Sequence, residues 1–176
     1  IDPTDDITPE PVPQKEYSHL IMMSDVHLED YNKWYGLTSP QRISKMTEDL
    51  EAYYKKDKYE NLFILGDTSL DFWENSTYGG SYRRHLRSNT KTLIDNYLSK
   101  LSCKNQYIIP GNHEQYGHED WERIVGTKRD DAFTVGGYLI VTCDNFSGDL
   151  DPKQHSDGVY APTKLDFIKA KMDEHP

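Results

Sequence analysis

The sequence has few of the features on which several protein classes depend. Its 176 residues include two cysteines, Cys103 and Cys143, and no pair in CxxC spacing, which excludes a zinc ribbon and a disulfide scaffold. We expect both to be free thiols. The longest aliphatic runs, 20–23 and 62–65, are four residues each, whereas a membrane-spanning helix needs roughly 20. The sequence therefore predicts no membrane span.

Positive charge is also scarce. The chain has 20 Lys and Arg against 30 Asp and Glu, a formal net charge of −10. Nucleic acid is therefore not expected as a ligand of a broad surface. Residues 1–16 hold four of the nine prolines and five acidic residues, which predicts a flexible leader outside the fold. Such a leader is typical of the tether of an exported, periplasmic or lipid-anchored bacterial protein.

From residue 17 onward, short apolar runs alternate with stretches of helical period. The apolar runs are 19–23, 62–65 and 106–109, and the helical stretches between them begin near Ser39 and Tyr82. This alternation predicts parallel strands joined by crossover helices. Ser39 is the expected N-cap of the first helix, with Pro40 at its first position, and the second helix is expected over about 82–101.

The later part of the chain has a different pattern. Residues 132–135 and 138–143 flank Gly136-Gly137, a two-residue hairpin signal. A last helix is expected over about 163–174. The predicted fold class is therefore α/β, with helices flanking a mixed sheet whose first three strands are parallel.

Each of the three predicted parallel strands ends in residues able to bind metal. These are Asp25-Val26-His27, Gly66-Asp67 and Gly111-Asn112-His113-Glu114. Ligands bind beyond the carboxyl ends of parallel strands, so the three segments are expected to converge. If the strand continues that far, Asp25 and His27 share one face. Mixed oxygen and nitrogen ligands suit Mn, Fe or Zn better than Ca or Mg.

These three motifs, in this order, resemble those of the calcineurin-like metallophosphoesterases, and the resemblance covers about residues 20–114. It implies a layered sandwich fold, two divalent metal ions and a phosphorylated substrate. The implied reaction is hydrolysis of a phosphate mono- or diester by a metal-bridging hydroxide. Asp25 and His27 would hold the first ion, Asp67 would bridge, Asn112 would hold the second, and His113 would act as proton donor or charge stabiliser.

Two further residues near the third motif are candidates for supporting roles. Glu114 is expected to orient a neighbouring ligand rather than to bind metal itself. His118, four residues later, is expected in a loop beside the site, where it either touches substrate or is a plain surface residue.

The sequence departs from the family pattern after residue 114. The later histidine motif and the GHxH motif do not occur, so we expect residues 17–176 to be the N-terminal part of a longer phosphoesterase domain. Two alternatives stay open. One is a metal-poor interaction domain that keeps the fold, and the other is a domain completed by a second chain. The number of metal ions bound per chain separates the enzyme from the interaction domain.

Overall fold

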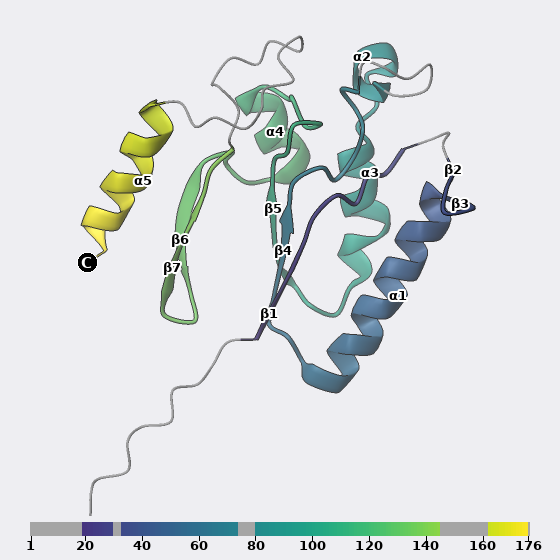
Figure 1. Ribbon diagram of the computed structural model, residues 1–176, viewed down its shortest axis with the longest axis horizontal. Coiled ribbons are helices and arrows are strands. Elements are labelled where there is room, and N and C mark those ends of the chain that lie inside the picture. Colours follow the sequence, from purple (N-terminus) through teal and green to yellow (C-terminus); the bar gives the residue numbers. More distant parts are fainter. Residues whose placement is uncertain (1–18, 30–32, 74–79, 145–161, 176) are drawn as a thin grey trace, which may run out of the picture.

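The computed structural model describes residues 19–29, 33–73, 80–144 and 162–175. The predicted leader, 1–16, lies outside these ranges. The described chain is α/β, with a parallel sheet and antiparallel hairpins flanked by helices (Figure 1). In chain order the elements are β1 (Leu20–Met23), β2 (Lys33–Trp34), β3 (Leu37–Thr38), α1 (Ser39–Asp57), β4 (Asn61–Leu65), α2 (Ser81–His85), α3 (Asn89–Asn96), the 3-10 turn η1 (Leu98–Lys100), β5 (Asn105–Ile109), α4 (His118–Val125), β6 (Asp131–Val135), β7 (Tyr138–Thr142) and α5 (Pro162–Glu174).

The central sheet has the order β1-β4-β5, and both pairings are parallel. The prediction of parallel strands joined by helical crossovers is therefore confirmed. β4 lies in the middle, and its residues Leu62, Phe63 and Ile64 are all buried. A continuous apolar run of this kind suits a parallel strand that is covered on both faces.

One face of the sheet packs against α1 and α3, which lie on the same side of it (Figure 1). The shared core contains strand, helix and loop residues. Its buried members are Val26, Leu28, Ile43, Leu50, Tyr59, Leu62, Ile64, Leu93, Leu98, Leu101 and Cys103. Both cysteines are free, as predicted. This core fixes the two helices against the strands and leaves the carboxyl ends of the strands at one edge.

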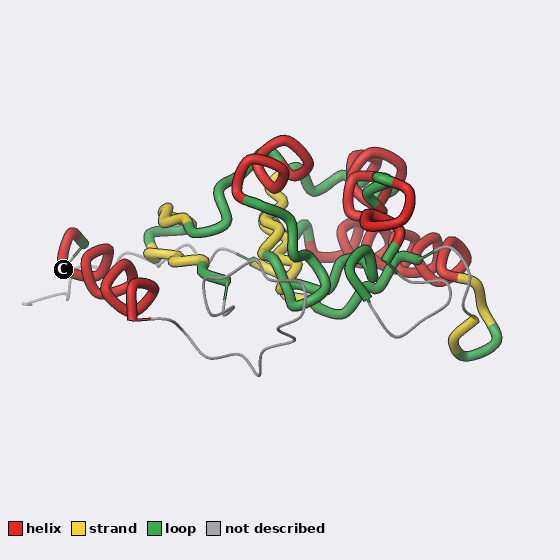
Figure 2. The backbone as a smooth tube through the Cα atoms, turned by 90° about the horizontal axis from the view of Figure 1, so that it is seen from above, coloured by secondary structure: helices red, strands yellow, loops and turns green. Residues whose placement is uncertain are grey.

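The other face of the sheet is covered in part by the hairpin of β6 and β7. The Tyr107 ring stacks between Phe63, at 4.7 Å, and Phe133, at 4.6 Å. Met22 aligns with Phe63 in register but is 55% exposed. The hairpin meets the sheet through these rings and forms a sheet of its own, so parallel and antiparallel strands occupy separate sheets and not one mixed sheet. Figure 2 shows the hairpin beside the central strands, with α5 beyond it.

The start of α1 differs from the prediction by one residue. Thr38, and not Ser39, is the N-cap. Its hydroxyl accepts a hydrogen bond from the Gln41 backbone N–H at 3.4 Å, and the Gln41 side chain accepts from the Thr38 N–H at 2.9 Å. This capping box satisfies two backbone donors at once, which a cap at Ser39 would not do.

The predicted single helix over 82–101 is wrong, because the chain forms α2, α3 and η1 there. Leu86 turns into the left-handed region, with φ of 52°, and ends α2. Ser88 then caps α3 by accepting from the Lys91 N–H at 3.0 Å. The sequence pattern also failed to predict α4, which buries Trp121 and Ile124.

A buried carboxylate, Asp71, anchors the start of α3 to the loop after β4. It accepts hydrogen bonds from the Asn89 N–H at 2.8 Å and from the Tyr116 hydroxyl. Burial raises the pKa of Asp71 to about 6, although the hydrogen bonds from Tyr116 and from the Asn89 and Thr90 backbone oppose the shift. The folded state therefore holds this proton more tightly than the unfolded chain does.

The burial of the central strand leads to a first prediction, which concerns stability. Replacing Ile64, which is fully buried, with Ala should lower the free energy of unfolding by about 2–5 kcal/mol, because it removes buried methyl groups and leaves a cavity. Met22→Ala, on the neighbouring strand, should change it by less than about 1 kcal/mol because that side chain is largely exposed. Urea denaturation followed by circular dichroism measures both, and equal losses would contradict the described burial.

The raised pKa of Asp71 predicts that the free energy of unfolding depends on pH. Its contribution to stability is fully present below about pH 4, the range of an unfolded Asp, and is lost as the pH rises through about 6. The free energy of unfolding should therefore fall over this window by up to about 3 kcal/mol from this group alone. In Asp71→Asn that part of the decline should be missing. Urea midpoints between pH 4 and pH 7 test this, and parallel profiles for the two proteins would contradict it.

Candidate metal centre

Three loops meet at the edge where the parallel strands end. β1 stops at Met23, β4 at Leu65 and β5 at Ile109. The first two loops run beside each other, because the Asp25 N–H donates to the Gly66 carbonyl at 3.2 Å and the His27 N–H to the Asp67 carbonyl at 2.9 Å. The expected convergence of the three motifs is therefore observed.

The backbone at three of the motif residues is left-handed. Asp25, His27 and Asp67 have φ values of 57°, 49° and 52°. The condition on which Asp25 and His27 would share one strand face is not met, since β1 ends at Met23 and the chain turns instead. Positive φ at a non-glycine residue costs on the order of 1–3 kcal/mol and clusters at functional sites.

The side chains of His27, Asp67 and His113 form the centre of the site. One ligand atom from each lies within 4.8 Å of the other two. His27 Nε2 is 3.7 Å from Asp67 Oδ2, and the His27 and His113 rings meet edge to face at 5.5 Å. His27 Nε2 is buried and has no hydrogen-bond partner among the described residues. An imidazole and carboxylate set of this kind could hold a borderline divalent cation.

Other predicted residues border this cluster. The Asn112 amide lies against Asp67, and with its oxygen and nitrogen exchanged its nitrogen donates to Oδ1 at 3.1 Å and to Oδ2 at 3.0 Å. Asp25 Oδ1 is 3.7 Å from His27 Nε2, with its side chain 63% exposed. His118 was expected in a loop, but it is the exposed first residue of α4 and lies outside the cluster.

Glycine makes the close approach of the loops possible. A Cβ on Gly111 would lie 2.1 Å from Asp67 Oδ1 and 2.4 Å from the Asp67 backbone nitrogen. A Cβ on Gly66 would lie 2.7 Å from the Gly111 Cα. The carboxylate of Asp67 therefore occupies space that only a glycine at position 111 leaves open.

Glu114 lies underneath the loops and is fully buried. Its carboxylate accepts hydrogen bonds from the backbone N–H groups of Asp67 at 2.8 Å, Ser69 at 2.9 Å and Gly111 at 2.9 Å. Burial and the negative charge of Asp67 raise its pKa to about 7, against the effect of these hydrogen bonds. Glu114 thus joins the second and third loops without entering the cluster.

The charge state of Asp67 is set by opposing effects. Burial raises its pKa, but the His27 side chain, the His113 charge and the His113 backbone N–H together lower it below the usual range. The His113 N–H donates to Oδ1 at 3.2 Å. The Asp67 carboxylate is therefore ionised, as a bound cation requires of this ligand.

Two residues near the site were not found by sequence reasoning. The Trp34 ring contacts the His27 ring edge to face at 5.2 Å. Arg129 is buried, donates to Asp144 Oδ2 at 2.8 Å and to the Glu114 carbonyl at 3.3 Å, and so ties the third loop to the end of β7. Neither stands in a local pattern, because each acts through a contact between distant parts of the chain.

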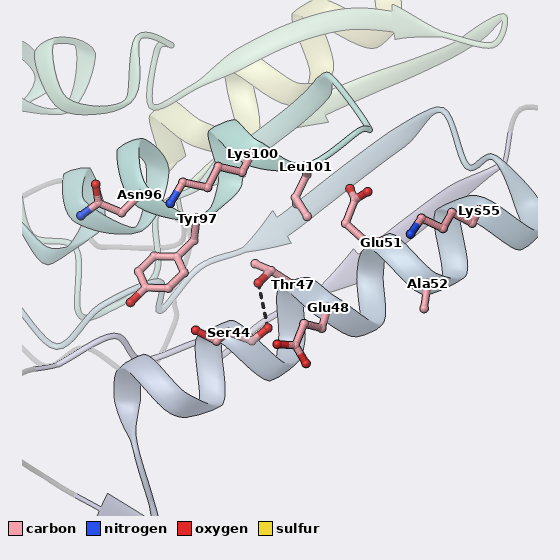
Figure 3. A pocket seen from close by; sticks show the side chains of 10 residues that line it. All are labelled: Ser44, Thr47, Glu48, Glu51, Ala52, Lys55, Asn96, Tyr97, Lys100 and Leu101. Carbon is pink, nitrogen blue, oxygen red and sulfur yellow. Dashed lines mark hydrogen bonds between the residues drawn. The ribbon is translucent and has the colours of Figure 1, made fainter.

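A groove of about 630 Å³ lies elsewhere, between α1 and the α3–η1 segment (Figure 3). Its lining includes Glu48, Lys55 and Lys100, and none of the metal-site candidates. The hydrogen bond drawn there, from Thr47 Oγ1 to the Ser44 carbonyl, is internal to α1. The groove is therefore separate from the candidate metal centre.

Comparisons with known proteins give no independent assignment. No protein-family model matches the chain, and a search of curated proteins finds no match. Within the described residues, no helix combines the length and the hydropathy that crossing a bilayer requires.

The packing of Gly111 against Asp67 predicts that a substitution at Gly111 weakens metal binding. Gly111→Ala should displace the Asp67 carboxylate and weaken binding of Mn²⁺ at least tenfold, the size of effect expected when the support of a ligand is disturbed. Gly126→Ala is the control: its Cβ would meet nothing within 4 Å, and since φ there is 85° the change should lower stability but leave the Mn²⁺ affinity unchanged. Isothermal titration calorimetry measures the affinities, and an unchanged affinity in Gly111→Ala would contradict the described contact.

Proposed function

We propose that this chain carries the metal-binding part of a phosphoesterase of the calcineurin-like type, which hydrolyses a phosphate mono- or diester. The observation that supports this most is the gathering of His27, Asp67 and His113 within 4.8 Å. Each of these residues comes from one of the three motifs on which the resemblance rests; His27 and Asp67 are proposed metal ligands, and His113 is the proposed proton donor. The left-handed backbone at His27 and Asp67 adds support, since strain of this kind is retained at functional sites.

The residues present fit divalent metal ions of the Mn, Fe or Zn class. His27 Nε2 is a buried nitrogen without a hydrogen-bond partner among the described residues, and it lies beside the ionised carboxylate of Asp67. In the proposal Asp25 and His27 would hold one ion and Asn112 a second, and Asp67 would be a ligand of both. When bound, two such ions polarise the phosphoryl oxygens and lower the pKa of the attacking water.

The other residues have supporting roles in this proposal. His113 lies at the cluster and serves as proton donor to the leaving group or as a positive charge beside it. Glu114 fixes the backbone at Asp67, Ser69 and Gly111 by accepting hydrogen bonds from their N–H groups. Arg42 and Ser39 approach the carbonyl of His27, each at 3.4 Å, and hold that loop from the side of α1.

The sandwich architecture belongs to the same proposal. Leu20, Met22 and Leu65 are exposed on the sheet away from α1, at 40% or more. Parallel sheets are normally covered on both faces. A second layer packed on this face would complete the layered fold that the resemblance implies.

One observation favours a second function, a metal-poor interaction domain that keeps the fold. Among the described residues, His, Cys, Asp and Glu form just one group of three or more that could hold an ion, whereas two ions need more donors. Metal analysis of the purified chain separates the two functions. Two equivalents of Mn²⁺ or Zn²⁺ favour the enzyme, and none favours the interaction domain.

The proposed enzyme predicts loss of activity in two variants. With Mn²⁺ present, the chain should hydrolyse bis(4-nitrophenyl) phosphate or 4-nitrophenyl phosphate, and Asp67→Asn and His113→Gln should each reduce kcat/KM by about 10²-fold or more. His19→Gln, which removes a half-exposed imidazole at the opposite end of β1, should leave it unchanged. Release of nitrophenol measures the rates. Hydrolysis that survives in Asp67→Asn would refute the assigned roles.

A further inference from the structure

Trp34 and Arg42 form a stacked pair beside the candidate metal centre. The Trp34 ring meets the His27 ring at 5.2 Å, and the Arg42 guanidinium carbon lies 4.8 Å from the centre of a Trp34 ring. Both residues are partly exposed, and Arg42 Nε is itself buried without a hydrogen-bond partner among the described residues. One indole separates the guanidinium from a proposed metal-binding imidazole.

The hairpin of β2 and β3 builds this pair. Its two turn residues, Tyr35 and Gly36, have φ values of 55° and 77°, a left-handed pair that suits the twist of a tight hairpin. The hairpin runs directly into α1, and Arg42 lies on the first turn of that helix. Arg42 Nη2 donates to Ser39 Oγ at 2.8 Å, which holds the guanidinium in place.

Arg42 differs from several other cations of the chain in its partners. Lys45, Lys91 and Arg123 each pair with a carboxylate three or four residues away on the same helix. Arg42 has no carboxylate partner among the described residues, where its contacts are a carbonyl, a hydroxyl and a ring. A guanidinium already held over an aromatic ring loses little freedom when it binds an anion.

We propose that Arg42, held by Trp34, binds a second anionic group of the substrate. The substrate class is then a phosphate ester whose organic part carries a carboxylate or a further phosphate. The scissile phosphate belongs at the His27–Asp67–His113 cluster, and the indole places Arg42 one group further along. This inference rests on the proposed function. The inference goes beyond that function by naming the substrates that the site prefers, phosphate esters whose organic part is anionic.

Two matched probes test the inference by binding. Phenylphosphonate and 4-carboxyphenylphosphonate differ in one carboxylate, and calorimetric titration with Mn²⁺ present gives both affinities. The carboxylated probe should bind about tenfold more tightly to the unaltered chain, the effect of one charge-assisted hydrogen bond. In Arg42→Met the ratio should fall to about one. In Lys45→Met, which removes a charge one turn further along α1, the ratio should persist.

Three results would overturn the inference. They are equal affinities in the unaltered chain, a ratio unchanged by Arg42→Met, and an equal loss for both probes in Arg42→Met, which would show that Arg42 acts by holding His27 alone. Arg42→Lys, which keeps the charge but not the planar fork, should give an intermediate ratio and guards against misfolding. Mn²⁺-dependent hydrolysis of bis(4-nitrophenyl) phosphate, measured in parallel, separates the two proposals. Hydrolysis with equal probe affinities refutes the second-anion site alone, and absence of hydrolysis beside a tenfold ratio that Arg42→Met abolishes refutes the proposed function alone.

Discussion

The candidate site depends on one buried interaction, the carboxylate of Glu114 with backbone N–H groups of two loops. Asp67 and Gly111 donate to one of its oxygens and Ser69 to the other. An unpaired buried carboxylate would be strongly destabilising, so the N–H groups have to stay where they are. This holds the loop after β4 against the loop after β5 and sets the position of the Asp67 side chain. The lack of a Cβ at Gly111 then leaves room for that carboxylate.

Several features that cost folding free energy lie at this one edge of the sheet. Burial raises the pKa of Glu114, the backbone is left-handed at Asp25, His27 and Asp67, and His27 Nε2 is buried without a hydrogen bond to a described residue. The well-packed core below the edge, from Leu62 and the helices on it, can offset this cost. A bound cation would reduce this cost, because it would pair with the Asp67 carboxylate and accept His27 Nε2 as a ligand. The strain is therefore consistent with a site built to bind.

Sequence reasoning predicted the parts that local patterns encode. The apolar runs identified all three parallel strands, and the polar residues after them identified His27, Asp67 and His113. It could not predict the break at Leu86, because a left-handed cap at a leucine has no local signature. Trp34 and Arg42 were missed for a related reason, since their importance comes from a contact with His27 that exists only in the folded chain. Alternation along a strand does not apply to Asp25 and His27, whose side chains approach through a turn.

The most direct test of the central claim is a crystal structure of the chain soaked in Mn²⁺, with anomalous scattering used to locate the metal. Two anomalous peaks are expected at the Asp67 carboxylate, with His27 against one of them. Crystals that diffract well but show no peak at Asp67 would contradict it.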